Sequence, residues 1–151
     1  MPRHSENRIL PYTPAQVFEL VGDVARYPEF LPWTAAARVR ARRPLLGRGP
    51  GAEVMEADLV ISFKVFREKF GSRVILIPGQ HRIETDYLDG PFRYLHSFWQ
   101  ISPAPEGCRV EFDVDFEFRN VVLQKIIGVV FDEAMRRVVT AFEKRAKQLY
   151  G

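Results

Sequence analysis

The sequence predicts an α+β fold in which a curved antiparallel sheet of six to seven strands wraps around one long C-terminal helix. Two patterns carry this prediction. Residues 109–119 alternate strictly between charged and apolar side chains, and residues 121–150 repeat apolar side chains at helical spacing. A strand with one buried and one solvent-exposed face is typical of a sheet covered on one side only. The amphipathic helix is the element that can cover it, because each apolar face alone would meet water.

The alternation near the C-terminus is the clearer of the two patterns. Its apolar positions are Val110, Phe112, Val114, Phe116 and Phe118. Its charged positions are Arg109, Glu111, Asp113, Asp115, Glu117 and Arg119. The helix that follows is predicted to bury Leu123, Ile127, Val130, Ala134, Val138, Ala141, Phe142 and Leu149. At about 1.5 Å per residue this helix is about 45 Å long, enough to cross a whole sheet.

The chain before residue 109 is expected to supply the other strands. Ser5–Leu10 forms a short first strand, and a helix begins at Thr13-Pro14, where an N-cap hydroxyl precedes a proline in the first helical position. Two prolines in segment 27–33 end that helical region. Further strands are predicted at residues 35–43, 55–64, 70–77, 81–88 and 92–101. Asp89-Gly90-Pro91 is a strong turn signal between the last two.

The composition is that of a globular chain. Because 46% of the 151 residues are hydrophobic and 27% are charged, one domain spanning residues 1–151 can form a core. No apolar run approaches the roughly 20 residues of a membrane helix, and the N-terminal segment lacks the features of a signal or transit peptide. The lone Cys108 excludes an internal disulfide and fits a reducing compartment. We therefore expect a cytoplasmic protein, with peripheral attachment at the inner membrane as the alternative.

A sheet that curves around a helix can leave a cavity between them. The side chains expected to face inward offer almost no polar atoms, so an apolar guest is the one that fits. The predicted walls are Met55, Leu59, Ile61, Phe63, Leu95, Trp99, Phe112, Val114, Val130 and Ala134. The proline-bracketed segment with Phe30 and Trp33 either lines the mouth of this cavity or plugs one end of the core.

Over nearly its whole length the chain resembles the coenzyme-Q-binding START-domain family, within the polyketide cyclase/dehydrase and START superfamily. The segments that carry the resemblance are Arg8–Tyr12, Tyr27–Trp33, Asp89–Arg93 and Val110–Phe118. The second is the most specific, because it holds two prolines and a tryptophan in a fixed order. The resemblance implies a helix-grip (START-like) fold, ubiquinone bound in a hydrophobic tunnel, and support of respiratory electron transfer. The family also includes bacterial ribosome-association toxins, while its eukaryotic members are mitochondrial.

No catalytic or metal site is expected. His4, His81 and His96 are scattered without the spacing of a helical metal site, and no histidine near Cys108 marks it as a nucleophile. The acidic positions of residues 111–117 are expected to form the solvent face of their strand. A cyclase or aromatase acting in the cavity would need inward-facing acids or bases, and the inferred inner faces contain hardly any.

The densest basic run is a candidate phosphate-binding surface. It consists of Arg38, Arg40, Arg42, Arg43 and Arg48. Phospholipid head groups or ribosomal RNA are its conceivable partners, but no aromatic residues are interleaved as at a nucleic-acid surface, which favours a plain solvated strand face. No DNA partner is expected. Val121, Val122 and Val129 fall outside the helical stripe and, if clustered with Leu45 and Leu46, would form a membrane-docking or dimer patch.

The leading functional prediction is thus a carrier or chaperone that binds ubiquinone and performs no chemistry on it. Trp99, Tyr94, His96 and Arg93 are the expected hydrogen-bond donors to the quinone oxygens. Ribosome association through the basic run is the second hypothesis. A polyketide cyclase or aromatase is the third.

Overall fold

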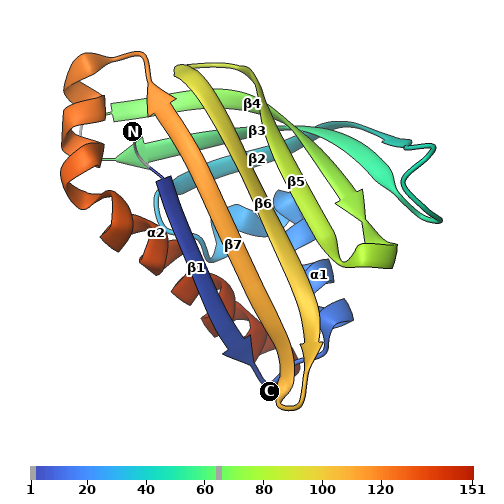
Figure 1. Cartoon of the computed structure of the whole chain (residues 1–151). Coiled ribbons are helices and arrows are strands. Elements are labelled where there is room, and N and C mark those ends of the chain that lie inside the picture. The colour runs from blue at the N-terminus through green and yellow to red at the C-terminus, as the bar shows by residue number, and fades with distance from the viewer. Residues whose placement is uncertain (1–2, 64–65) are drawn as a thin grey trace.

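An antiparallel sheet curves around one long C-terminal helix (Figure 1). The computed structural model describes residues 3–63 and 66–151, and these residues contain seven strands in a single sheet. The strands are β1 (Arg3–Leu10), β2 (Thr34–Pro44), β3 (Glu53–Phe63), β4 (Phe66–Ile77), β5 (Arg82–Asp89), β6 (Phe92–Ala104) and β7 (Gly107–Phe118). The helical elements are α1 (Pro14–Gly22), η1 (Val24–Glu29), η2 (Pro78–Gln80) and α2 (Val121–Tyr150). The predicted α+β helix-grip fold is therefore confirmed.

The sheet order is β1-β7-β6-β5-β4-β3-β2, so consecutive strands pair from β2 to β7 and the first strand closes beside the last. The alternation predicted for β7 is present, since Val110, Phe112, Val114, Phe116 and Phe118 are all buried. The solvent face of β7 is matched by arginines, with Arg3 3.1 Å from Asp113 and Arg93 3.2 Å from Glu117. This confirms that the acidic row lies on the wet face of a strand. None of the helices within residues 3–63 and 66–151 has the length and apolar character needed to cross a membrane.

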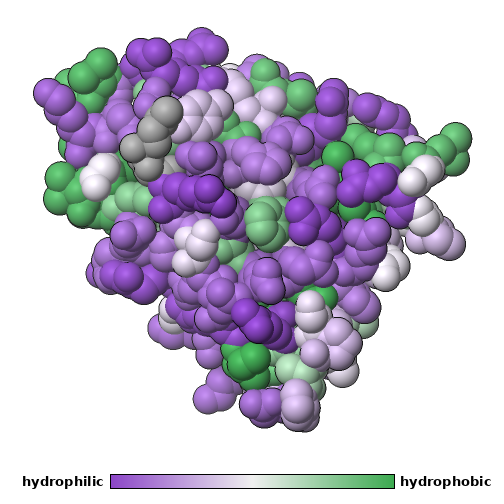
Figure 2. All heavy atoms as spheres, viewed as in Figure 1, coloured by the Kyte–Doolittle hydropathy of each residue, from purple (hydrophilic) through white to green (hydrophobic). Residues whose placement is uncertain are grey.

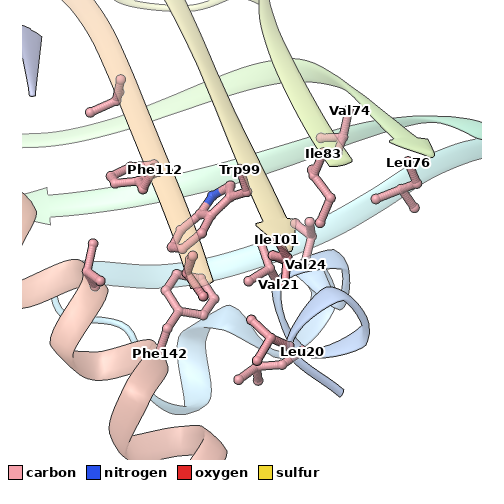
Figure 3. Packing of buried hydrophobic residues seen from close by; sticks show 14 of the residues in the cluster. Leu20, Val21, Val24, Val74, Leu76, Ile83, Trp99, Ile101, Phe112 and Phe142 are labelled. Atoms are coloured by element: carbon pink, nitrogen blue, oxygen red, sulfur yellow. The ribbon is translucent and has the colours of Figure 1, made fainter. Parts of the chain in front are cut away.

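The helix α1 begins where its capping residues place it. The Thr13 hydroxyl accepts a hydrogen bond from the Gln16 backbone N–H at 3.1 Å, and the Gln16 side chain accepts one from the Thr13 N–H at 3.0 Å. This reciprocal pair satisfies two donors that a helix start leaves open. Val17, Leu20 and Val21 of α1 are buried, and Figure 3 shows Leu20 and Val21 close to Ile101 of β6. The α1 helix thus covers one end of the sheet.

The helix α2 has the predicted bounds, but the face it buries is rotated from the predicted one. Its buried residues are Leu123, Phe131, Ala134, Val139, Phe142 and Ala146. Val130 is 37% exposed and Leu149 is 51% exposed, so their predicted burial is wrong. Successive residues of a helix are rotated by about 100° around its axis. Phe131, four residues after Ile127, therefore faces the sheet, whereas Val130, three residues after Ile127, lies on the flank of the helix.

One aromatic cluster joins α2 to the sheet. Trp99 of β6 stacks on Phe112 of β7 with ring centroids 4.4 Å apart, and the Phe142 ring of α2 meets Trp99 edge-on at 4.9 Å. Figure 3 shows these three rings together between the helix and the strands. Tyr27 and Phe30 add edge contacts to Phe142 at 5.4 Å and 5.2 Å. The space between α2 and the sheet is therefore filled by side chains in this half of the molecule.

Phe142→Ala is expected to lower the free energy of unfolding by about 3–5 kcal/mol, because it removes the ring on which the cluster converges and leaves a void. Urea denaturation followed by circular dichroism measures the change. Val129→Ala is the control, since Val129 is 86% exposed and its truncation should change stability by less than about 0.5 kcal/mol. An equal effect of the two substitutions would show that Phe142 does not anchor α2.

Candidate functional site

An apolar cavity of about 200 Å³ lies between the sheet and the N-terminal half of α2. Strands β3, β4, β6 and β7, helix α2, the first residue of β2 and the segment before it all contribute to its walls. The lining residues are Pro32, Trp33, Thr34, Ile61, Phe63, Glu68, Phe70, Phe92, Leu95, Val114, Phe116, Phe118, Leu123, Ile127, Ala134, Met135 and Val138. Among them, only Trp33, Thr34 and Glu68 carry polar side-chain atoms, so the cavity suits an apolar molecule.

The cavity has a closed inner end and a more open rim. Its inner end is built on Phe92, whose ring stacks on Phe118 at 4.5 Å and meets Phe70 and Phe116 edge-on at 5.1 Å and 5.3 Å. These four rings are all buried. The residues at Pro32, Trp33, Phe63 and Ile127 are partly exposed and so mark the rim. A ligand would enter between the segment that precedes β2 and the N-terminal half of α2.

Trp33 holds a strained backbone conformation at this rim. Its φ is +60°, in the left-handed region that bulky residues rarely adopt. Its carbonyl accepts a hydrogen bond from the Ser62 N–H at 2.8 Å, and its ring meets Phe63 edge-on at 5.8 Å. Strain of this kind costs about 1–3 kcal/mol and persists where surrounding contacts impose it, often beside a ligand. Of the two aromatic residues in this segment, Trp33 lies at the rim of the cavity and Phe30 packs against Tyr27 and Phe142.

Half of the residues predicted to form the binding site line this cavity. They are Trp33, Ile61, Phe63, Leu95, Val114 and Ala134. The other six do not line it. They are Phe30, Met55, Leu59, Trp99, Phe112 and Val130.

The positions of these six residues differ. Trp99 and Phe112 fill the other half of the interior together with Phe142, and Met55 is fully buried in solid core. Leu59 is partly buried against that core, and Val130 is turned far enough outward to be 37% exposed. The lining residues that the prediction missed include Phe116 and Phe118, which share the face of Val114 on β7. Alternation reveals a face, but it does not reveal where along the strand the cavity lies.

The expected hydrogen-bond donors to a quinone also lie outside the cavity. Trp99 belongs to the aromatic cluster, Arg93 pairs with Glu117, and His96 Nδ1 lies 2.7 Å from Asp86 Oδ1. Tyr94 is not among the lining residues. Among the lining residues, Trp33 carries an indole N–H that can donate, while the Thr34 hydroxyl is directed to the Pro32 carbonyl at 3.4 Å.

Most of the predicted basic surface is already neutralised by carboxylates. Arg40 lies 2.9 Å from Asp58 and 3.3 Å from Asp89, and three further pairs occupy the rest of the run. These pairs are Arg42–Glu53 at 2.8 Å, Arg43–Glu56 at 3.1 Å and Arg48–Glu84 at 3.3 Å. Hydrogen bonding from Arg82, assisted by Arg48, holds the pKa of Glu84 below its usual range despite partial burial. Of the five arginines, only Arg38 lacks an acidic partner among residues 3–63 and 66–151.

Two further observations concern chemistry. In the part of the chain that the structure describes, no three histidine, cysteine, aspartate or glutamate side chains converge as a metal site would require. Cys108 is fully buried, and burial raises the pKa of its thiol, which disfavours the reactive thiolate. The expectation that this chain performs no catalysis stays a prediction.

The family model described as polyketide cyclase/dehydrase and lipid transport matches residues 10–143. The chain belongs to this family. It is 41% identical over 145 residues to the ribosome association toxin RatA of Rickettsia prowazekii (strain Madrid E), with 94% of each chain covered. It is also 31% identical over 153 residues to the mitochondrial coenzyme Q-binding protein COQ10 homolog B of Xenopus laevis, covering 98% of this chain and 59% of that one.

A solved structure supports the same assignment. The solution structure of an 18 kDa protein from Caulobacter crescentus superposes on this chain with a TM-score of 0.81 at 36% identity. The match covers 100% of this chain and 99% of that protein. The family and the START-like fold that the sequence predicts are therefore confirmed.

Two truncations distinguish solid core from cavity wall. Met55→Ala is expected to lower the free energy of unfolding by about 2–5 kcal/mol, because a fully buried side chain leaves an empty space. Ile61→Ala should cost clearly less, since Ile61 already borders a cavity and is partly exposed. Guanidinium denaturation of both variants makes the comparison. If Ile61→Ala cost as much as Met55→Ala, the two positions would be packed alike and the assigned cavity would be in doubt.

Proposed function

We propose that this protein binds one lipophilic molecule of the isoprenoid quinone class, with ubiquinone the leading candidate, in the cavity beside α2. The observation that carries the proposal is the apolar cavity with its partly exposed rim. The family, whose description includes lipid transport, and the coenzyme Q-binding relative support the same ligand class. The protein would shield the ligand from water and deliver it, and the proposal includes no chemical step.

The size of the cavity bears on how such a ligand binds. At about 200 Å³ it is smaller than the roughly 300–1,000 Å³ typical of small-molecule sites. It therefore holds only the inner part of a prenyl chain unless α2 and the sheet move apart. Each buried methylene contributes about 0.8 kcal/mol, and part of this gain offsets the freedom that the ligand loses on binding. We place the tail among the inner phenylalanines and the quinone ring at the rim, near the indole N–H of Trp33.

Filling the cavity tests this proposal. Ala134 is buried on the cavity side of α2, and Ala134→Phe should weaken binding of decylubiquinone at least tenfold, about 1.4 kcal/mol, by occupying the space of the tail. Isothermal titration calorimetry measures the affinity. Ala141→Phe is the matched control, because Ala141 lies on the same helix but does not line this cavity. The proposal fails if the unmodified protein does not bind decylubiquinone and organic extracts of the purified protein contain no quinone.

Ribosome association is a second candidate, favoured by the names of relatives that align over nearly the whole chain. Besides the Rickettsia protein, the ribosome association toxin RatA of Pseudomonas aeruginosa is 37% identical over 144 residues. The predicted contact surface on β2 is mostly engaged with carboxylates. Lys144 and Lys147 on α2 are exposed and have no acidic partner within residues 3–63 and 66–151. We therefore assign the phosphate contacts of this candidate to the C-terminal half of α2.

Co-sedimentation with 50S and 30S ribosomal subunits at increasing salt tests the second candidate. Binding to RNA phosphates should weaken steeply as salt rises, because each contact releases counterions. Lys144→Glu combined with Lys147→Glu should abolish co-sedimentation, whereas Arg42→Glu, which removes a cation already paired with Glu53, should have a smaller effect. Co-sedimentation that does not depend on salt, or that survives the lysine substitutions, would contradict this assignment.

A further inference from the structure

The first turns of α2 expose an apolar surface that the fold does not cover. It consists of Val121, Val122, Val129 and Val130, which we call the valine patch, and their side chains are 62%, 61%, 86% and 37% exposed. Figure 2 shows hydrophobic residues gathered over the N-terminal part of α2, at the left of the view. Single exposed apolar residues are common, but four within ten residues of one helix form a patch of the kind that marks an interaction site.

The patch adjoins the ligand cavity. Leu123 and Ile127 line the cavity from the same three turns of α2 that carry the valine patch. At about 100° per residue, Val122 and Val129 point in one direction, away from Leu123 and Ile127, whereas Val130 lies at the border between the patch and the cavity side. A surface that the valine patch contacts would thus lie within a helix diameter, about 10 Å, of the cavity wall.

Unpaired cations flank the patch. Arg119 lies two residues before the helix and Lys125 lies within it, and both are exposed. Neither has an acidic partner among residues 3–63 and 66–151. Further along the same helix, by contrast, Arg136 and Arg137 both pair with Glu133 at 3.3 Å. Apolar side chains flanked by unpaired cations fit an anionic bilayer, which has an apolar hydrocarbon core beneath negatively charged head groups.

We propose that the valine patch docks the protein on an anionic lipid bilayer and so brings the cavity rim to the source of its ligand. The inference rests on the proposed binding of a lipophilic molecule, which resides in membranes rather than in water. A second copy of the chain fits this surface less well. A twofold interface would place the same patch of both copies together, and thus bring their unpaired Arg119 and Lys125 side chains close to one another. Four valines also provide far less area than the roughly 1,200–2,000 Å² of a stable interface.

Vesicle flotation tests the proposal. The unmodified protein should float with vesicles of phosphatidylcholine and phosphatidylglycerol, and less with phosphatidylcholine alone. Val122→Glu combined with Val129→Glu should reduce the bound fraction about tenfold, because it places charges where apolar groups enter the bilayer. Arg119→Gln combined with Lys125→Gln should remove the preference for the anionic vesicles.

Leu46→Glu is the matched control. Leu46 is 91% exposed at the β2–β3 hairpin, which Figure 1 shows at the opposite end of the molecule from the start of α2. Replacing Leu46 should leave vesicle binding unchanged. This result would show that Leu46 is not part of the surface formed by the valines, with which the sequence analysis had grouped it. No flotation of the unmodified protein, or an equal loss with Leu46→Glu, would overturn the proposal. So would conversion of a dimer to a monomer by the valine substitutions in sedimentation velocity, since the patch would then be a contact between copies.

A second measurement separates this proposal from the binding function. Decylubiquinone titrated into the valine double variant, without vesicles, should bind as tightly as it does to the unmodified protein, because neither valine lines the cavity. Normal quinone binding with no vesicle binding by the unmodified protein overturns the docking surface alone. If the double variant loses quinone binding, the valine patch and the cavity are not independent sites. If the unmodified protein does not bind quinone, the proposed function is wrong.

Discussion

The contact between α2 and the sheet determines the rest of the structure. A single helix has to cover the apolar face of a curved sheet, and it does so in two different ways along its length. Near its C-terminal half, Phe142 closes on Trp99 and Phe112 with ring distances that leave no room for a guest. Near its N-terminal half, the small side chain of Ala134 faces the sheet and a cavity remains. The aromatic cluster can therefore hold the helix in place while the other half stays free to adapt to a ligand.

Polar contacts join α2 to the edge of the sheet along its length. Arg8 of β1 lies 2.9 Å from Glu143, close to the aromatic cluster, and His4 Nδ1 lies 3.1 Å from Asp132 Oδ1 nearer the middle of α2. The partly exposed Arg8–Glu143 ion pair contributes little to stability, about 0–1 kcal/mol, so it orients the helix more than it holds it. No such pair involves Arg119 or Lys125 at the start of α2 within the described residues. The start of α2 is nevertheless tethered to β7, because the Gln124 side chain accepts a hydrogen bond from the Phe118 N–H at 2.7 Å.

The sequence was sufficient to predict the fold because the strongest signals were periodic. The β7 alternation and the length of α2 specify which faces are apolar, and a curved sheet around a helix is an arrangement that buries them all. The position of the cavity could not be predicted in the same way. Met55 and Ile61 lie on one face of β3, yet one is solid core and the other cavity wall, because curvature decides how far each lies from α2. Likewise, the partners of Arg40 and Arg48 come from strands distant in sequence, so only the folded sheet shows that these cations are engaged.

The distribution of charge along α2 relates the proposed activities to one another. This helix contains six basic and three acidic side chains, an excess equal to the net charge of +3 of the whole chain. The excess is not uniform, since the valine patch and its two cations lie at the first turns and the unpaired Lys144 and Lys147 lie near the end. A bilayer contact at one end and an RNA contact at the other would use separate surfaces of the same helix. The cavity, however, adjoins only the first of these surfaces. A ligand that moves the N-terminal half of α2 would therefore alter a membrane contact directly. It would reach a ribosome contact only through the aromatic cluster that lies between the two.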